Sequence, residues 1–94
     1  MTYCEPLAAA YALKPPSGEP VSDAELLVFG EAMVPVADAA VADGRQDLAD
    51  MFTLIAQVNI DPEGTTDAET TEALNEVLAF SDEVNAACGI DLLQ

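Results

Sequence analysis

The apolar residues of this chain recur at helical spacing in four segments, and this pattern constrains the fold more than any other feature of the sequence. Apolar side chains three and four positions apart lie on one face of an α-helix. The strict alternation of apolar and polar residues that indicates a β-strand is absent from the sequence. A chain of 94 residues is also too short for two ordinary domains. We therefore predict an all-α protein with a single helical domain over residues 1–94.

Turn-forming sequences separate the four segments and set their approximate limits. Paired prolines, glycines and an Asp-Pro pair lie between them, and none of these continues a helix. The predicted helical segments are 3–13, 22–44, 45–58 and 66–89. Because the connections are short, consecutive helices are expected to run antiparallel. The sequence thus predicts a small up-down four-helix bundle.

Local signals predict how several of these helices begin and where one is disturbed. A Ser or Thr followed three residues later by Glu is the pattern of a capping box. The three such pairs are Thr2–Glu5, Ser22–Glu25 and Thr66–Glu69. Pro35 lies inside the second segment, where proline removes a backbone donor and clashes with the preceding turn. We therefore expect a kinked second helix, bent between 30 and 35, or two short helices in tandem.

Each segment carries one apolar stripe that we expect to face the core. In chain order the stripes are Cys4, Leu7, Ala8 and Tyr11; Leu26, Phe29, Gly30, Met33, Ala37, Ala40 and Val41; Leu48, Met51, Phe52, Ile55 and Val58; and Ala73, Leu74, Val77, Leu78, Val84 and Cys88. The large residues Met33, Met51, Phe29, Phe52 and Phe80 are of the kind that can line an apolar pocket. We expect them to pack the core instead.

The two cysteines, Cys4 and Cys88, lie at opposite ends of the chain. In an up-down bundle the first helix begins at the end of the molecule where the fourth helix finishes. Both cysteines belong to apolar stripes, so both sulfur atoms are expected to point inward at that end. We therefore predict a disulfide between Cys4 and Cys88, the alternative being two separate buried thiols. An even number of cysteines in a short acidic chain also suits an oxidising compartment.

The charge balance excludes several functions, since 18 acids and two bases give a net charge of −16 without any histidine. Two bases cannot neutralise a phosphate backbone, so we expect no direct nucleic-acid binding, and anionic membrane surfaces repel such a chain. No apolar run is long enough for a transmembrane segment. The acids recur at ordinary amphipathic spacing. They are consistent with a solvated surface, with a docking surface for a basic protein partner, or with imitation of nucleic acid.

Sequence features of catalysis are absent. The chain lacks a histidine to act as general base, a glycine-rich phosphate loop and a nucleophile elbow. A haem group would find no histidine ligand. We therefore predict that the protein is not an enzyme and carries no cofactor.

The loop between the third and fourth segments resembles a calcium-binding loop in part. Oxygen-bearing side chains occupy the ligand positions 1, 3, 5 and 9 of that pattern, with glycine at position 6. These residues are Asn59, Asp61, Glu63 and Asp67. Position 12, which requires a bidentate Glu, is Thr70. Turn and N-cap chemistry accounts for the same residues, so we expect no specific metal site here.

Three short motifs together resemble a bacterial protein family. They are the aromatic-plus-cysteine opening Tyr3-Cys4, the proline in Ala32-Met33-Val34-Pro35, and the closing Cys88-Gly89-Ile90-Asp91. With these motifs the chain resembles the small exported or lipid-anchored helical proteins of high-GC Gram-positive bacteria (actinobacteria), which are largely of unknown function. The resemblance implies a helical fold and a cell-envelope location. Those proteins carry a leader, whereas the N-terminus of this chain has no basic region followed by an apolar one.

These observations lead to one expected function and one alternative. We expect a non-enzymatic secreted or cell-envelope protein that acts as a protein-binding or structural module. If Met1 is the native start, the alternative is a cytoplasmic or phage-encoded acidic inhibitor that imitates nucleic acid and blocks a DNA-binding protein.

Overall fold

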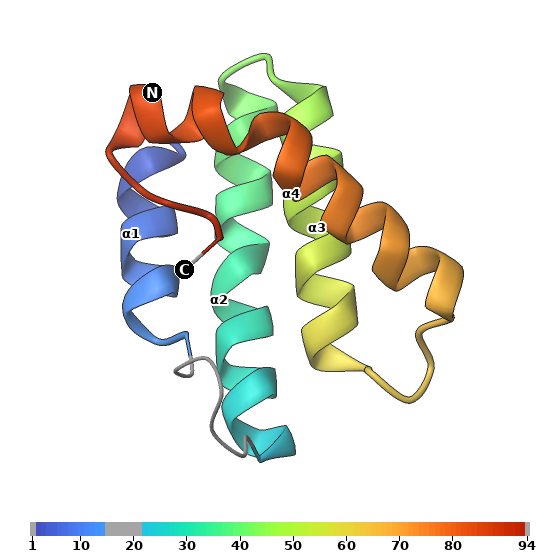
Figure 1. Ribbon diagram of the computed structural model, residues 1–94. Helices are drawn as coiled ribbons and strands as arrows, with labels where there is room; N and C mark the ends of the chain where they lie inside the picture. The colour runs from blue at the N-terminus through green and yellow to red at the C-terminus, as the bar shows by residue number, and fades with distance from the viewer. Residues whose placement is uncertain (1, 15–21, 94) are drawn as a thin grey trace.

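Four α-helices form the computed structural model, which describes residues 2–14 and 22–93 (Figure 1). The helices are α1 (Cys4–Ala12), α2 (Asp23–Ala42), α3 (Gln46–Ile60) and α4 (Asp67–Cys88). The described ranges contain no strand, so the predicted all-α four-helix fold is confirmed. α1, α2 and α3 stand side by side, and α4 crosses them obliquely on its way back to the start of α1 (Figure 1).

The starts of α2 and α4 follow the capping signals of the sequence. The Ser22 hydroxyl accepts a hydrogen bond from the Glu25 backbone N–H at 3.3 Å. At α4 both arms of the capping box form, because Thr66 accepts from the backbone of Glu69 and the Glu69 carboxylate accepts from the backbone of Thr66. These caps pair backbone donors that have no partner inside the helix.

The capping box predicted for Thr2 and Glu5 is wrong, since α1 has no side-chain cap of its own. Asp43, at the C-terminal end of α2, takes that role instead. Its carboxylate accepts hydrogen bonds from the backbone N–H groups of Thr2 and Tyr3, at 3.2 and 3.1 Å, and from the Thr2 hydroxyl. A carboxylate at a helix N-terminus satisfies free donors and interacts favourably with the helix dipole. Because this cap comes from a residue far away in the sequence, no local sequence pattern predicts it.

α2 is a single helix across Pro35, so the alternative prediction of two short helices in tandem is wrong. Its buried residues on both sides of the proline, including Met33 and Val36, belong to the hydrophobic core. α2 packs against both α1 and α3. The packing of these two interfaces outweighs the roughly 3 kcal/mol that an interior proline costs a helix.

The helix pair α2 and α3 forms the centre of the molecule. Gly30 allows their backbones to approach closely, because a Cβ atom at this position would lie 2.7 Å from Ile60 Cγ1 and 3.0 Å from the Ala56 carbonyl oxygen. Most of the largest fully buried side chains belong to this pair, and the others come from the N-terminal segment and α4: Tyr3, Phe52, Leu7, Met33, Leu48, Met51, Val36 and Val84. All four helices therefore contribute to one core.

Some residues of the predicted stripes are exposed. They are Ala8, Val41, Leu74 and Leu78. On α4, only Ala73 and Val84 are buried, because the helix crosses its neighbours obliquely. Leu74 and Leu78 keep 56% and 54% of their surface exposed. Helical periodicity identifies an apolar face, but the crossing angle decides how much of that face is covered.

Candidate functional site

The two ends of the chain meet at a disulfide, as predicted. Cys4 and Cys88 are bonded, with their Cα atoms 5.3 Å apart. The residues after α4 fold back over α1, where the Tyr11 hydroxyl donates a hydrogen bond to the Leu92 carbonyl oxygen at 3.1 Å. Leu92 is buried in the core. The N-terminal helix is thus held by a covalent bond and by the C-terminal segment.

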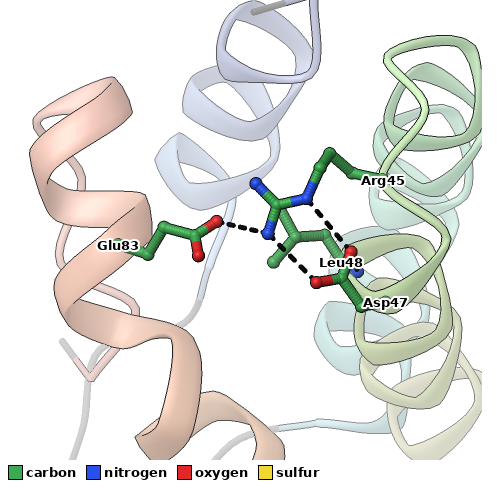
Figure 2. Close-up of polar contacts among 4 residues, drawn as sticks. All are labelled: Arg45, Asp47, Leu48 and Glu83. Carbon is green, nitrogen blue, oxygen red and sulfur yellow. Dashed lines mark hydrogen bonds and ion pairs between the residues drawn. The ribbon is translucent and has the colours of Figure 1, made fainter.

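An ion-pair cluster joins α4 to the start of α3 (Figure 2). The Arg45 guanidinium pairs with Asp47 at 3.0 Å and also with Glu83 of α4. Asp47 additionally accepts a hydrogen bond from the Leu48 backbone N–H at 2.9 Å. Hydrogen bonding to Arg45 lowers the pKa of Asp47, and hydrogen bonding to both carboxylates raises the pKa of Arg45. The sequence holds only one hint of this cluster, namely that Arg45 is one of two bases.

Tyr3 is fully buried near that cluster. Its ring packs against Phe52, with 5.7 Å between the ring centroids. Burial raises the pKa of the Tyr3 hydroxyl, and the negative charge of Glu83 raises it further. The hydroxyl has no hydrogen-bond partner among the described residues. Of the other charges around Tyr3, Asp47 and Glu83 are paired through Arg45 and Asp43 caps α1, so we assign this region a structural role.

A shallow, open surface along one side of α4 is the strongest candidate for a binding site. We call it the α4 groove. It is open to solvent, and all seven residues that line it belong to α4. The polar residues that line it are Asp67, Thr71, Glu72, Asn75 and Glu76. Two alanines, Ala68 and Ala79, complete the lining.

The electrostatics of the α4 groove centre on Glu76. One of its carboxylate oxygens, Oε2, is buried and has no hydrogen-bond partner among the described residues. Burial raises the pKa of Glu76, and the neighbouring carboxylates of Glu72 and Asp50 add to the effect. Both ion pairs in the described ranges use Arg45, so no cation of these ranges forms an ion pair with this group. A cationic group from outside would relieve the repulsion, which makes the groove suitable for a lysine or arginine side chain.

The four residues that resemble calcium ligands lie at the end of α3, in the following loop and at the start of α4. The Asn59 side chain donates to the Ile55 carbonyl oxygen at 2.7 Å, and Asp61 Oδ1 accepts from the Gly64 backbone at 3.0 Å. Asp67 is the first residue of α4, and Glu63 is exposed in the loop. Within residues 2–14 and 22–93, no three Asp, Glu, Cys or His side chains gather closely enough to hold a metal ion.

The large apolar residues considered as a pocket lining lie in or against the core. Phe29, Met33, Met51 and Phe52 are buried, and Phe80 packs against them while remaining partly exposed.

In the part of the chain that the structure describes, no helix is long and apolar enough to cross a membrane.

Comparison with protein-family models, with curated proteins and with solved structures finds no match to this chain.

Proposed function

We propose that this protein is a non-enzymatic binding module that recognises a basic surface on a protein partner in a secreted or cell-envelope setting. The observation that carries the proposal is the α4 groove, where Glu72 and Glu76 lie four residues apart and the negative charge of Asp50 on α3 adds to theirs. Neither ion pair of the described ranges includes these carboxylates. Like charges at this spacing repel one another. A partner that supplies a lysine or arginine side chain replaces this repulsion by attraction.

The distribution of charge over the whole surface supports the same partner. Fourteen of the seventeen carboxylates in the described ranges are exposed, and the chain carries a net charge of −16. Such a field attracts basic proteins over long distances and accelerates their association. It also repels nucleic acids and anionic membranes, which leaves protein as the favoured class of partner.

The Cys4–Cys88 disulfide supports the proposed compartment, because disulfides persist in oxidising surroundings and are rare in the bacterial cytosol. The resemblance to exported actinobacterial proteins points in the same direction. The chain's lack of histidine favours a role without acid–base catalysis.

The binding experiment is a titration of the oxidised protein with a flexible lysine-rich peptide, followed by calorimetry at low and moderate salt. We expect the double variant Glu72→Gln/Glu76→Gln to bind the peptide at least fivefold more weakly than the wild type. The matched control is Glu5→Gln/Asp82→Asn, which removes the same number of charges from exposed positions outside the groove. This control is expected to change the affinity less than twofold.

If both double variants weaken peptide binding equally, only the overall charge matters and the α4 groove is not the binding site. The absence of saturable binding would reject the function itself. The compartment is tested separately by alkylating thiols in the native cells before lysis. We expect no alkylation of Cys4 or Cys88, whereas two free thiols would favour the cytoplasmic inhibitor that imitates nucleic acid.

A further inference from the structure

α2 exposes a second apolar surface that the core does not use. Leu27, Val34 and Val41, which we call the α2 stripe, are spaced by seven residues and retain 39%, 45% and 52% of their surface. Residues seven apart lie on nearly the same side of a helix, since seven residues complete almost two turns. The α2 stripe therefore follows one side of the helix for about 21 Å, at 1.5 Å per residue.

Carboxylates alternate with these apolar side chains on the same face. Glu31 follows Leu27 by four residues and precedes Val34 by three, and Asp38 holds the corresponding place before Val41. Both carboxylates are exposed. Between Leu26 and Ala42 they are the only polar side chains of α2, so this helix is apolar on nearly every side. A helix of that kind is ordinarily covered on all faces.

The α2 stripe leads into a hollow between the start of α2 and the end of α3. The two ends lie at the same end of the molecule (Figure 1), and the hollow between them has a volume of about 300 Å³. Leu27 belongs to both the stripe and the hollow, and Ile60 adds a second apolar wall. Asp23, Asp61 and Glu63 line the same space. A lysine or arginine side chain fits this combination, because its aliphatic stem packs on apolar walls while its charged head reaches carboxylates.

The charges of this surface determine which occupant suits it. A second copy of the chain would bring Glu31 and Asp38 against the same surface, and both copies carry a net charge of −16. A helix that alternates apolar and basic residues at spacings of three and four matches the stripe and the carboxylates together.

We propose that the α2 stripe and the adjoining hollow form the docking surface for an amphipathic basic helix of the partner protein. This inference rests on the proposed function, because it takes the partner to be basic, and it names the surface and the partner's structural class. The docking mode is that of a helix laid along an apolar face, with anchors seven residues apart.

The test uses a synthetic 21-residue peptide with leucine at every seventh position and lysine three or four residues after each leucine. A second peptide has the same composition in scrambled order, which keeps the charge and removes the apolar face. We expect the ordered peptide to bind the oxidised protein at least tenfold more tightly than the scrambled one. In NMR spectra of the wild-type protein, its largest shift changes are expected at Leu27, Val34 and Val41.

Matched variants separate the α2 stripe from other exposed apolar residues. Val34→Ser/Val41→Ser is expected to weaken binding of the ordered peptide at least tenfold, while Leu74→Ser/Leu78→Ser on α4 leaves it within twofold. All four positions are exposed, and the folding of each variant is checked by circular dichroism. The NMR map of the wild-type protein provides the same information if a variant does not fold.

Four results would overturn the inference. Equal affinity for the ordered and scrambled peptides would show that the α2 stripe is not the docking surface, and so would shift changes confined to the α4 groove. Both results leave the proposed function intact. Dimerisation of the wild-type protein at high salt that Val34→Ser abolishes identifies a second copy as the occupant. If neither this peptide nor the flexible lysine-rich peptide binds, the proposed function fails as well.

Discussion

Individual carboxylates in this protein have different environments despite their similar sequence contexts. Most are exposed, whereas Glu76 is partly buried and faces Glu72 and Asp50. The pKa of Glu76 in the folded chain is raised above its ordinary value of 4.5, mainly by burial. Ionisation of this group therefore destabilises the folded state. The effect is absent below about pH 4.5 and grows as the pH rises through the folded pKa.

The substitution Glu76→Gln should accordingly stabilise the protein at pH 7 and leave its stability unchanged at pH 3. Glu72 lies four residues earlier on the same helix, and like charges at that spacing cost a helix about 0.2–0.5 kcal/mol. We expect a rise in Tm of about 1–3 °C at pH 7, measured by thermal unfolding. Asp82→Asn, which removes one exposed charge from the same helix, is the control. A lower Tm for Glu76→Gln at pH 7 would contradict this interpretation of the groove.

The loop residues that resemble calcium ligands are used by the backbone. Because Asp61 accepts from the Gly64 backbone, its carboxylate is part of the turn. We expect calorimetry to detect no saturable calcium binding at sub-millimolar concentrations, since the carboxylate required at position 12 is missing. A single saturable site that disappears in Asp61→Ala would prove the loop to be a metal site.

At the scale of the helices, α1 depends on contacts far from it in sequence. It is short, it is capped by Asp43, and its first residue is bonded to the last residue of α4. The two cysteines are 84 residues apart in sequence. In the loop-entropy account, a disulfide closing a loop of this size stabilises a protein by roughly 4.5 kcal/mol.

Removing the disulfide should therefore lower the stability sharply and release α1 before the other helices. We expect Cys4→Ala/Cys88→Ala to lose roughly 4.5 kcal/mol of unfolding free energy in urea titrations. Hydrogen exchange should quicken first in α1 and in the residues that follow α4. An unchanged urea midpoint, or uniform exchange across all four helices, would mean that packing alone holds α1 in place.

The contact between α2 and α3 provides a second prediction at this scale. Alanine is a better helix former than glycine by up to about 1 kcal/mol, so Gly30→Ala would stabilise an isolated helix. In the folded protein the added Cβ meets Ile60 Cγ1 at 2.7 Å and two backbone atoms at 3.0 Å. We expect Gly30→Ala to destabilise the protein by about 1–3 kcal/mol, because the two helices must move apart. Ile60→Ala in the same chain should restore part of this loss, whereas a higher Tm for Gly30→Ala alone would exclude a tight contact.

Over the whole molecule, self-repulsion should make stability depend on salt. A net charge of −16 on 94 residues opposes compaction, and about 0.1 M salt shortens the screening length to about 10 Å. We expect Tm at pH 7 to rise by about 5 °C between 10 mM and 500 mM sodium chloride. At pH 3, where the carboxylates are largely protonated, the same salt range should have little effect. Equal salt effects at both pH values would indicate a cause other than carboxylate repulsion.

Features that depend on neighbouring residues were determined by the sequence alone. The four helices, the caps at Ser22 and Thr66, and the presence of a loop before Thr66 follow from apolar spacing and turn residues, because these interactions span only a few positions. The loop begins at Asp61 and not at Asn59, since α3 continues to Ile60. The disulfide also followed, since four antiparallel helices with short connections bring Cys4 and Cys88 to one end.

Features that depend on how the helices cross were decided only by the tertiary structure. The oblique course of α4 exposes Leu74 and Leu78, opens the α4 groove and brings Glu83 to Arg45. Asp43 caps α1 across about forty residues of sequence. The crossing of two helices results from how all their side chains interlock, and contacts between distant residues form only once that crossing is set. Periodicity within one segment contains no information about the crossing of helices or about contacts between distant residues. The candidate binding surfaces therefore became visible only in the folded chain.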